Sequence, residues 1–182
     1  MYQSLPIDLD PALVTKLASI QMLALDVDGI LTDGSVTYDS NGAEHKSFNI
    51  KDGLGIKLAQ QAGIKVAIIT GRVSPMVERR ANELHIDYLI QGREDKGTAL
   101  TELEEKSGIS LKNIAYMGDD LPDYLAIRMA GIGITVADGH ADVQAIADWI
   151  TANAGGQGAV REVCDALLVS HDQYQQMTAS FK

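Results

Sequence analysis

The chain has 182 residues, of which 46% are hydrophobic, and this is enough for one domain, residues 1–182, with a hydrophobic core. Its formal net charge of −10 at pH 7 argues against nucleic acid or an anionic membrane as a partner, because both attract basic surfaces. The single cysteine, Cys164, excludes an intramolecular disulfide, a zinc site of several thiolates and a CxxC redox motif.

The first residues, Met1 to Asp10, lack the basic and apolar regions of a signal peptide. No apolar run approaches the roughly 20 residues that a membrane-spanning helix needs. We therefore expect a soluble protein of the cytoplasm. A helix is expected to open at Asp10-Pro11, where proline occupies the first helical position.

Apolar, β-rich runs then alternate with helical patterns. This order is typical of βαβ units, in which helices cover a parallel sheet. The expected strands are 23–27, 65–69, 88–90, 113–117 and 132–136. The expected helices are 53–62, 75–84 with Ser74 as its cap, 96–106, 122–129 and 159–168. The sequence thus predicts an α/β fold, a Rossmann-like parallel sheet in a three-layer αβα arrangement.

Two segments depart from this alternation. In residues 34–50, alternating apolar residues flank Asn41-Gly42, a strong signal for a β-hairpin turn, and we expect a hairpin flap there. The glycine-rich stretch 155–158 is typical of a flexible joint, and it would open a C-terminal tail over residues 155–182.

Asp26 and Asp28 lie at the end of the first strand and lead into a turn at Gly29. In parallel sheets ligands bind at the carboxyl ends of the strands. Two neighbouring carboxylates that lose their hydration repel each other, so a cation or a shared proton is needed beside them. An ordinary Asp-Gly turn remains an alternative. A calcium loop fits less well, because Gly29 falls at loop position four and Thr37 replaces the closing glutamate.

Later strand ends carry complementary groups. Thr70-Gly71-Arg72 offers a hydroxyl, an amide and a guanidinium to phosphate oxygens, and Lys96 could neutralise phosphate charge, although an exposed lysine in a first helical turn is the alternative. A second acidic group follows the fourth strand. It consists of Asp119, Asp120 and Asp123. Oxygen ligands of this kind suit Mg²⁺.

In this order and spacing, residues 23–123 resemble the haloacid dehalogenase superfamily of phosphohydrolases. The segments 26–34, 48–53, 68–72 and 155–165 resemble, more narrowly, the 3-deoxy-D-manno-octulosonate (KDO) 8-phosphate phosphatase family, with mild departures at Ile30 and Lys51. The resemblance implies a magnesium-dependent homotetramer that hydrolyses KDO 8-phosphate, a cytoplasmic step in the synthesis of the inner lipopolysaccharide sugar.

The resemblance also implies roles for individual residues. Asp26 would be the nucleophile that forms an aspartyl phosphate, and Asp28 would be the general acid and then the general base. Asp26, the backbone carbonyl of Asp28 and Asp119 would bind Mg²⁺. Thr70, Gly71 and Lys96 would bind the phosphoryl group. Asp120 would act through water or orient the site, and Asp123 is a weaker candidate that could cap the next helix.

The intervals between these motifs leave no room for a cap domain, so the site should be open. We expect a lid from a neighbouring subunit, with Arg161 in the tail as a contributor. Candidates to bind the substrate carboxylate or to line a shared site are Arg72, Arg80, Lys51 and Arg161, although a basic residue taken alone is more often a solvated surface charge.

Three other functions stay open. The substrate could be a related sugar acid phosphate such as KDN 9-phosphate, or a phosphoprotein. Alternatively, the chain could be a catalytically weak oligomerisation module of sugar-acid activation, although the intact set of catalytic motifs argues against that role.

Overall fold

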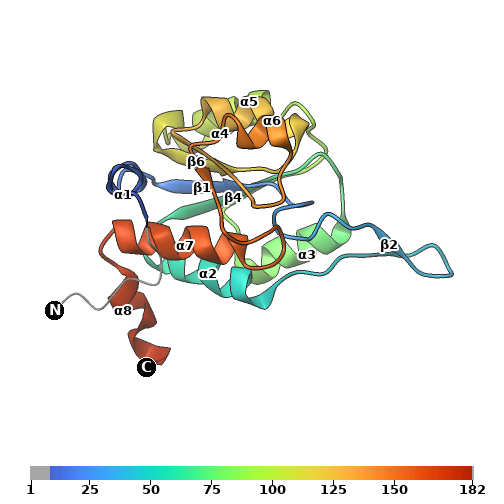
Figure 1. Ribbon diagram of the computed structural model, residues 1–182. Coiled ribbons are helices and arrows are strands. Elements are labelled where there is room, and N and C mark those ends of the chain that lie inside the picture. The colour runs from blue at the N-terminus through green and yellow to red at the C-terminus, as the bar shows by residue number, and fades with distance from the viewer. Residues whose placement is uncertain (1–8, 182) are drawn as a thin grey trace.

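The computed structural model describes residues 9–181, so the expected domain bounds 1–182, and most of the Met1 to Asp10 segment, extend beyond the described residues. Its centre is a six-stranded parallel sheet with the order β5-β4-β1-β6-β7-β8 (Figure 1). The strands are β1 (Met22–Leu25), β4 (Lys65–Ile69), β5 (Tyr88–Ile90), β6 (Ile114–Met117), β7 (Ile132–Thr135) and β8 (Trp149–Ile150). The predicted parallel sheet is confirmed.

Helices cover both faces of the sheet. The helices are α1 (Pro11–Leu17), α2 (Ile50–Gln61), α3 (Pro75–Leu84), α4 (Lys96–Ser107), α5 (Tyr124–Met129), α6 (Ala141–Gln144), α7 (Ala159–Ser170) and α8 (Tyr174–Thr178), with 3-10 turns at Leu111–Asn113, Leu121–Asp123 and Ala179–Phe181. In Figure 1, α4, α5 and α6 lie on one face, while α2, α3 and α7 lie on the other. This is the expected three-layer αβα arrangement.

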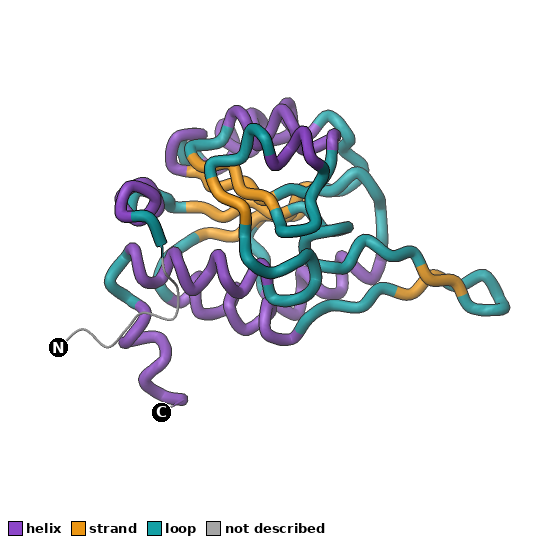
Figure 2. The backbone as a smooth tube through the Cα atoms, in the orientation of Figure 1, coloured by secondary structure: helices purple, strands orange, loops and turns teal. Residues whose placement is uncertain are grey.

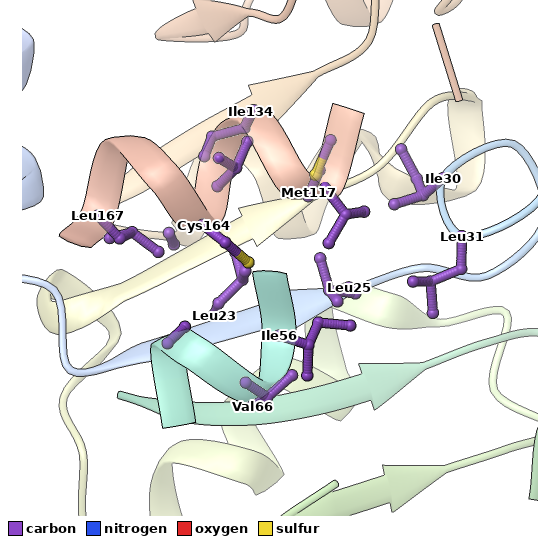
Figure 3. Close-up of a cluster of buried hydrophobic side chains, with 14 of the residues drawn as sticks. Leu23, Leu25, Ile30, Leu31, Ile56, Val66, Met117, Ile134, Cys164 and Leu167 are labelled. Atoms are coloured by element: carbon purple, nitrogen blue, oxygen red, sulfur yellow. The ribbon is translucent and has the colours of Figure 1, made fainter. Parts of the chain in front are cut away.

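The central strand β1 is apolar and buried at every position. Leu23 and Leu25 point into the core on the side of α2 and α7 (Figure 3). Met22 and Ala24 belong to the second core, together with residues of α4 and α5. Side chains alternate between the faces of a strand, so a strand that is covered on both faces needs apolar residues at every position.

The helix α7 is part of this core and is not a loose appendage. Val160, Val163 and Cys164 are fully buried, and α7 packs along α2. Its first turn is held by Asp52 of α2, whose Oδ1 accepts a hydrogen bond of 2.8 Å from the backbone N–H of Arg161. The part of the expected tail that does not belong to the core therefore begins after Ser170.

The hairpin forms a long arm that projects from the body (Figure 2). Its strands β2 (Thr37–Tyr38) and β3 (Glu44–His45) pair antiparallel around a turn in which Gly42 has a φ of 80°. We call residues 34–49 the arm, because Ile50, which we expected to end the hairpin, begins α2 instead with Asn49 as its N-cap. The function of the arm as a flap stays a prediction.

Several short elements were not predicted from the sequence, namely β8, α6 and α8. They contain two to five residues each, too few to display a helical or strand period. Among the described residues, no helix is long and apolar enough to cross a membrane.

Candidate active site

The register of the sheet brings the predicted strand-end motifs together. Leu25, the last residue of β1, pairs with Ile68 of β4 and Met117 of β6. The residues that follow these strands therefore meet at one edge. They line a cavity of about 320 Å³, whose walls are Asp26, Asp28, Gly34, Thr70, Gly71, Arg72, Glu94, Lys96, Asp119, Asp120, Pro122 and Asp123.

Three carboxylates in this cavity lie close enough to share a cation. Asp26, Asp119 and Asp123 each offer an oxygen, and these oxygens all lie within 4.8 Å of one another. Hard oxygen donors in this number suit Mg²⁺, which keeps several of its waters and binds few carboxylates. The donor set of the described residues therefore fits the predicted metal.

Backbone packing holds the acidic residues close together. Gly29 has a φ of 89°, and a Cβ placed there would lie 2.0 Å from Oδ2 of Asp119. A Cβ at Gly155 would lie 1.8 Å from the carbonyl oxygen of Gly29, and the N–H of Gly156 donates to the carbonyl of Ile30 at 2.9 Å. The expected flexible joint at 155–158 is thus wrong, because these glycines allow a close approach to the catalytic turn.

Asp123 is the centre of the charged network beneath the cavity, with an exposed fraction of 1%. Its Oδ1 accepts hydrogen bonds from Lys96 Nζ at 2.7 Å and from the hydroxyl of Tyr116 at 2.6 Å. Its Oδ2 accepts from the backbone N–H groups of Asp119 at 3.1 Å and Asp120 at 3.3 Å. With four donors already bound, Asp123 fits a positioning role better than direct metal binding. Tyr116 was not predicted as a site residue.

Lys96 joins the nucleophile candidate to this network. Its Nζ lies 2.8 Å from Oδ2 of Asp26 and 2.7 Å from Oδ1 of Asp123, and the residue is 4% exposed. The alternative of an exposed first-turn lysine is therefore wrong. Burial lowers the pKa of Lys96, but Asp26 and Asp123 outweigh it and the net shift is upward.

The carboxylates of the cluster are electrostatically unfavourable on their own. Burial, together with the charge of Asp123, raises the pKa of Asp26 to about 7, although Lys96 opposes the shift. The same two causes raise the pKa of Asp119 to about 7. Positive charge beside both groups would reverse the direction of these shifts, since an opposite charge favours the ionised form. The cluster thus favours binding of a divalent cation.

Asp28 lines the same cavity and is paired with a residue that the sequence did not indicate. Lys46 of the arm donates a hydrogen bond to Oδ1 of Asp28. A lysine in a hairpin is usually a solvated charge, so no sequence signal marked it. Arg72, which lines the cavity, reaches the arm as well, with a distance of 2.8 Å from its NH2 to Oε2 of Glu44.

The other basic candidates do not enter the cavity of this chain. Arg80 lies beside the arm, with its guanidinium carbon 5.7 Å from the ring centre of Phe48. Lys51 and Arg161 line a separate cavity of about 620 Å³. Arg161 also pairs with Asp165 at 2.8 Å on its own helix. A substrate-binding role for these three residues stays a prediction.

Known proteins share this arrangement. A profile of haloacid dehalogenase-like hydrolases matches residues 89–163. The KDO 8-phosphate phosphatase KdsC of Salmonella typhimurium is 47% identical over 160 residues, covering 88% of this chain and 85% of that protein. The KDO 8-phosphate phosphatase of Moraxella catarrhalis, crystallised with a magnesium ion, a phosphate ion and KDO, has a TM-score of 0.92 at 49% identity, over 94% of this chain and 98% of that chain.

The cobalt-bound form of the corresponding phosphatase of Haemophilus influenzae has a TM-score of 0.85 at 39% identity, covering 88% of this chain and 94% of that chain. Identity of 47% over 88% of the chain is enough to show the family. The chain therefore belongs to the 3-deoxy-D-manno-octulosonate 8-phosphate phosphatase family of haloacid dehalogenase-like hydrolases.

Proposed function

We propose that this chain is a magnesium-dependent phosphoric monoester hydrolase that converts KDO 8-phosphate to KDO and phosphate. The observation that carries the proposal is the cluster of Asp26, Asp119 and Asp123, which lies beside Lys96 at the carboxyl ends of the parallel strands. The chain that holds this cluster belongs to the phosphatase family. A relative of 49% identity holds magnesium, phosphate and KDO together, which supports the same substrate class here.

The residues suggest a two-step reaction. A carboxylate oxygen of Asp26 attacks phosphorus, and the bond between phosphorus and the sugar oxygen breaks as the aspartyl phosphate forms. Asp28 gives its proton to the departing alkoxide. In the second step Asp28 takes a proton from water, the water oxygen attacks phosphorus, and phosphate leaves as Asp26 is restored.

The remaining groups of the site would bind the metal ion and the charged groups of the substrate. Asp26, Asp119 and the backbone carbonyl of Asp28 would hold Mg²⁺, which supplies positive charge against the phosphoryl oxygens when it is bound. Lys96, Thr70 and Gly71 would bind the same oxygens, whose negative charge spreads in the transition state. Arg72 lines the cavity and could pair with the substrate carboxylate, for which a planar guanidinium is suited.

The experiment that tests this function compares the turnover of KDO 8-phosphate, KDN 9-phosphate and a phosphopeptide by the same purified protein. A specificity constant highest for KDO 8-phosphate supports the proposal. Preference for KDN 9-phosphate would keep the mechanism and reassign the substrate. Turnover of none of the three would favour the oligomerisation module.

Removal of the metal should abolish activity. Treatment with a chelator is expected to stop hydrolysis, and Mg²⁺ should restore it, whereas Ca²⁺ should bind but support little turnover because its larger, looser coordination shell misplaces the carboxylates. Continued hydrolysis after exhaustive chelation would contradict the metal role of Asp119.

The metal should also change how stability depends on pH. In the metal-free protein the folded pKa values of Asp26 and Asp119 are raised from 3.8 to about 7. Groups with raised folded pKa values favour the folded state at low pH, and this stabilisation is lost as the pH rises through about 7. Without metal, the melting temperature should fall as the pH rises from 3.8 to about 7. With saturating Mg²⁺, it should stay level over the same range.

Asp28→Asn should slow turnover by about 10²- to 10⁴-fold, the usual contribution of a general acid and base. The asparagine keeps the size of the side chain and can still accept a hydrogen bond from Lys46, and Glu44 remains as an anionic neighbour of Lys46, so the variant should still fold, with a lower melting temperature. Steady-state kinetics on KDO 8-phosphate measure the effect. A loss below tenfold would reassign Asp28 to a turn.

We also propose a cytoplasmic homotetramer in which the arms pack together. The arm exposes Val36 by 47% and Tyr38 by 62%, and exposed apolar side chains at this density suit an interface between subunits. The single cysteine, Cys164, is free and buried, which is compatible with a reducing compartment.

The tail after Ser170 is proposed to close the site of a neighbouring subunit. In Figure 1, α8 and the C-terminus lie at the end of the molecule away from the arm, so the tail is not placed to cover its own cavity. Deleting residues 171–182, which spares α7, should lower kcat/KM for KDO 8-phosphate much more than for a small aryl phosphate. Equal losses on both substrates, or a fully active monomer by light scattering, would contradict the shared lid.

A further inference from the structure

The side chain of Lys46 is buried, although most residues of the arm are exposed. Its neighbours His45 and Ser47 are exposed, whereas the side chain of Lys46 is 1% exposed. An ammonium that loses its hydration is unfavourable unless it is paired with negative charge. Lys46 therefore needs the partners that it has, Oδ1 of Asp28 and, at 3.5 Å, Oε1 of Glu44.

These contacts continue into an alternating row of charges. Asp28 is paired with Lys46, Lys46 lies beside Glu44, and Glu44 is paired with Arg72 on the loop after β4. The row links the turn that follows β1 with the turn that follows β4, through two residues of the arm. Oε1 of Glu44 is buried and has no hydrogen bond, and Lys46 is the cation that lies beside it, while Arg72 pairs with Oε2.

We propose that Lys46 is a positioning residue for proton transfer by Asp28. By holding Oδ1 of Asp28, Lys46 fixes the plane and direction of the carboxyl group and leaves Oδ2 free of this contact to carry the proton. The proposal rests on the proposed function, because it assigns a partner to the general acid and base of that reaction.

A direct contact between Lys46 and the substrate is the main alternative, and the geometry disfavours it. Lys46 is not among the residues that line the cavity, and its side chain is almost fully covered. Asp28, in contrast, lines the cavity and is 26% exposed. Lys46 thus acts through Asp28, and its loss should lower kcat while KM stays near its normal value.

The two steps of the reaction separate a positioning role from a general structural one. With 4-nitrophenyl phosphate the leaving group departs without protonation, so the first step does not need Asp28. The second step still needs Asp28 to take a proton from water. Loss of Lys46 should therefore spare the first turnover on this substrate and slow the following ones, because the aspartyl phosphate accumulates.

The test uses Lys46→Met, which keeps the length of the side chain and removes the charge, and Lys46→Arg, which keeps the charge. The matched control is Lys57→Met, which changes an exposed lysine of α2. For Lys46→Met, kcat on KDO 8-phosphate should fall by about 10²-fold, the cost of a small misplacement of a catalytic group, with KM changed by less than about twofold. Lys46→Arg should recover part of the loss, and Lys57→Met should match the wild type.

On 4-nitrophenyl phosphate, rapid mixing of Lys46→Met should show a burst of about one nitrophenolate per site before a slow steady state. Magnesium affinity by calorimetry should stay close to that of Lys57→Met, whereas the melting temperature should fall, because Asp28 and Glu44 lose their shared cation. A raised KM with normal kcat, or equal slowing of the burst and the steady state, would overturn the proposal.

Failure of the role proposed for Lys46 can be told apart from failure of the proposed function. If the wild type does not hydrolyse KDO 8-phosphate, the proposed substrate is wrong, but the burst on 4-nitrophenyl phosphate still tests the link between Lys46 and Asp28. If the wild type hydrolyses KDO 8-phosphate and Lys46→Met does so at the same rate, only the role of Lys46 is lost.

Discussion

Asp26→Asn is expected to lower turnover of KDO 8-phosphate by at least about 10⁴-fold, the order of loss found when a covalent nucleophile is removed. A neutral amide is a poor nucleophile and cannot form the acyl phosphate. Lys96, Thr70 and the other phosphate-binding groups remain, so phosphate binding should persist while chemistry stops.

The same substitution should not destabilise the metal-free protein. Asp26 is buried beside Asp123, and its raised pKa shows that its charge is unfavourable there without metal. Asparagine keeps the shape of the side chain and an oxygen that can accept from Lys96, but it removes one negative charge. We therefore expect a melting temperature without metal at least equal to that of the wild type, the usual trade between stability and activity at a catalytic site.

Asp33→Asn is the matched control for this experiment. Asp33 belongs to the same loop, is exposed, and accepts a hydrogen bond from the N–H of Ser35 at 2.9 Å, which asparagine can also accept. Its activity should equal that of the wild type. More than about 1% residual activity in Asp26→Asn would contradict the nucleophilic role, since covalent catalysis leaves much less.

The strand-end motifs could be predicted because each lies next to a simple signal. The runs before Asp26, Thr70 and Asp119 are apolar apart from the exposed Lys65 that begins β4, and they end in turn residues, as is typical of strands covered on both faces. Parallel strands place their carboxyl ends on the same edge, so order along the chain was enough to bring these motifs together.

The supporting residues gave no such signal. Tyr116 lies inside a buried strand, where an aromatic residue is expected for packing alone, and its hydrogen bond with Asp123 depends on how β6 meets the following 3-10 turn. Lys46 contacts Asp28 only because the part of the arm that returns to the body passes beside the turn after β1. Tertiary packing decides which distant segments come into contact. A single sequence does not show this when the segments have no regular helix or strand pattern.

The tail illustrates a different error. The glycines of residues 155–158 predicted a flexible joint, because glycine is common in flexible segments. In the structure Gly155 touches the backbone of Gly29, and only a residue without a side chain fits there. Glycine serves both the close approach of two backbone segments and the flexibility of a loop, so the composition of a segment does not show which of these applies.

Lys96→Met is expected to have the second largest effect, and it should act on stability and activity together. The substitution leaves the buried carboxylates of Asp26 and Asp123 without their shared cation. Removing one partner of a buried ion pair costs about 3–5 kcal/mol of unfolding free energy. Denaturant unfolding without metal should show a loss of this size, whereas Lys112→Met, at an exposed position, should show none.

Magnesium should restore much of this stability but little of the activity. A bound cation balances the carboxylates, so the unfolding free energy of Lys96→Met should depend on Mg²⁺ more steeply than that of the wild type. The phosphoryl oxygens still lack the ammonium, and losing one such charged donor should lower kcat by about 10²- to 10³-fold.

A second substitution separates the two effects. Lys96→Met combined with Asp123→Asn removes one positive and one negative charge. Asparagine can still accept from Tyr116, but its amide nitrogen cannot accept from the N–H groups of Asp119 and Asp120, so the metal-free double variant should recover only part of the stability that Lys96→Met loses. Its activity should remain as low as that of the single variant, because phosphate binding is not repaired. Recovery of activity along with stability would mean that Lys96 serves the fold and does not bind the phosphoryl group.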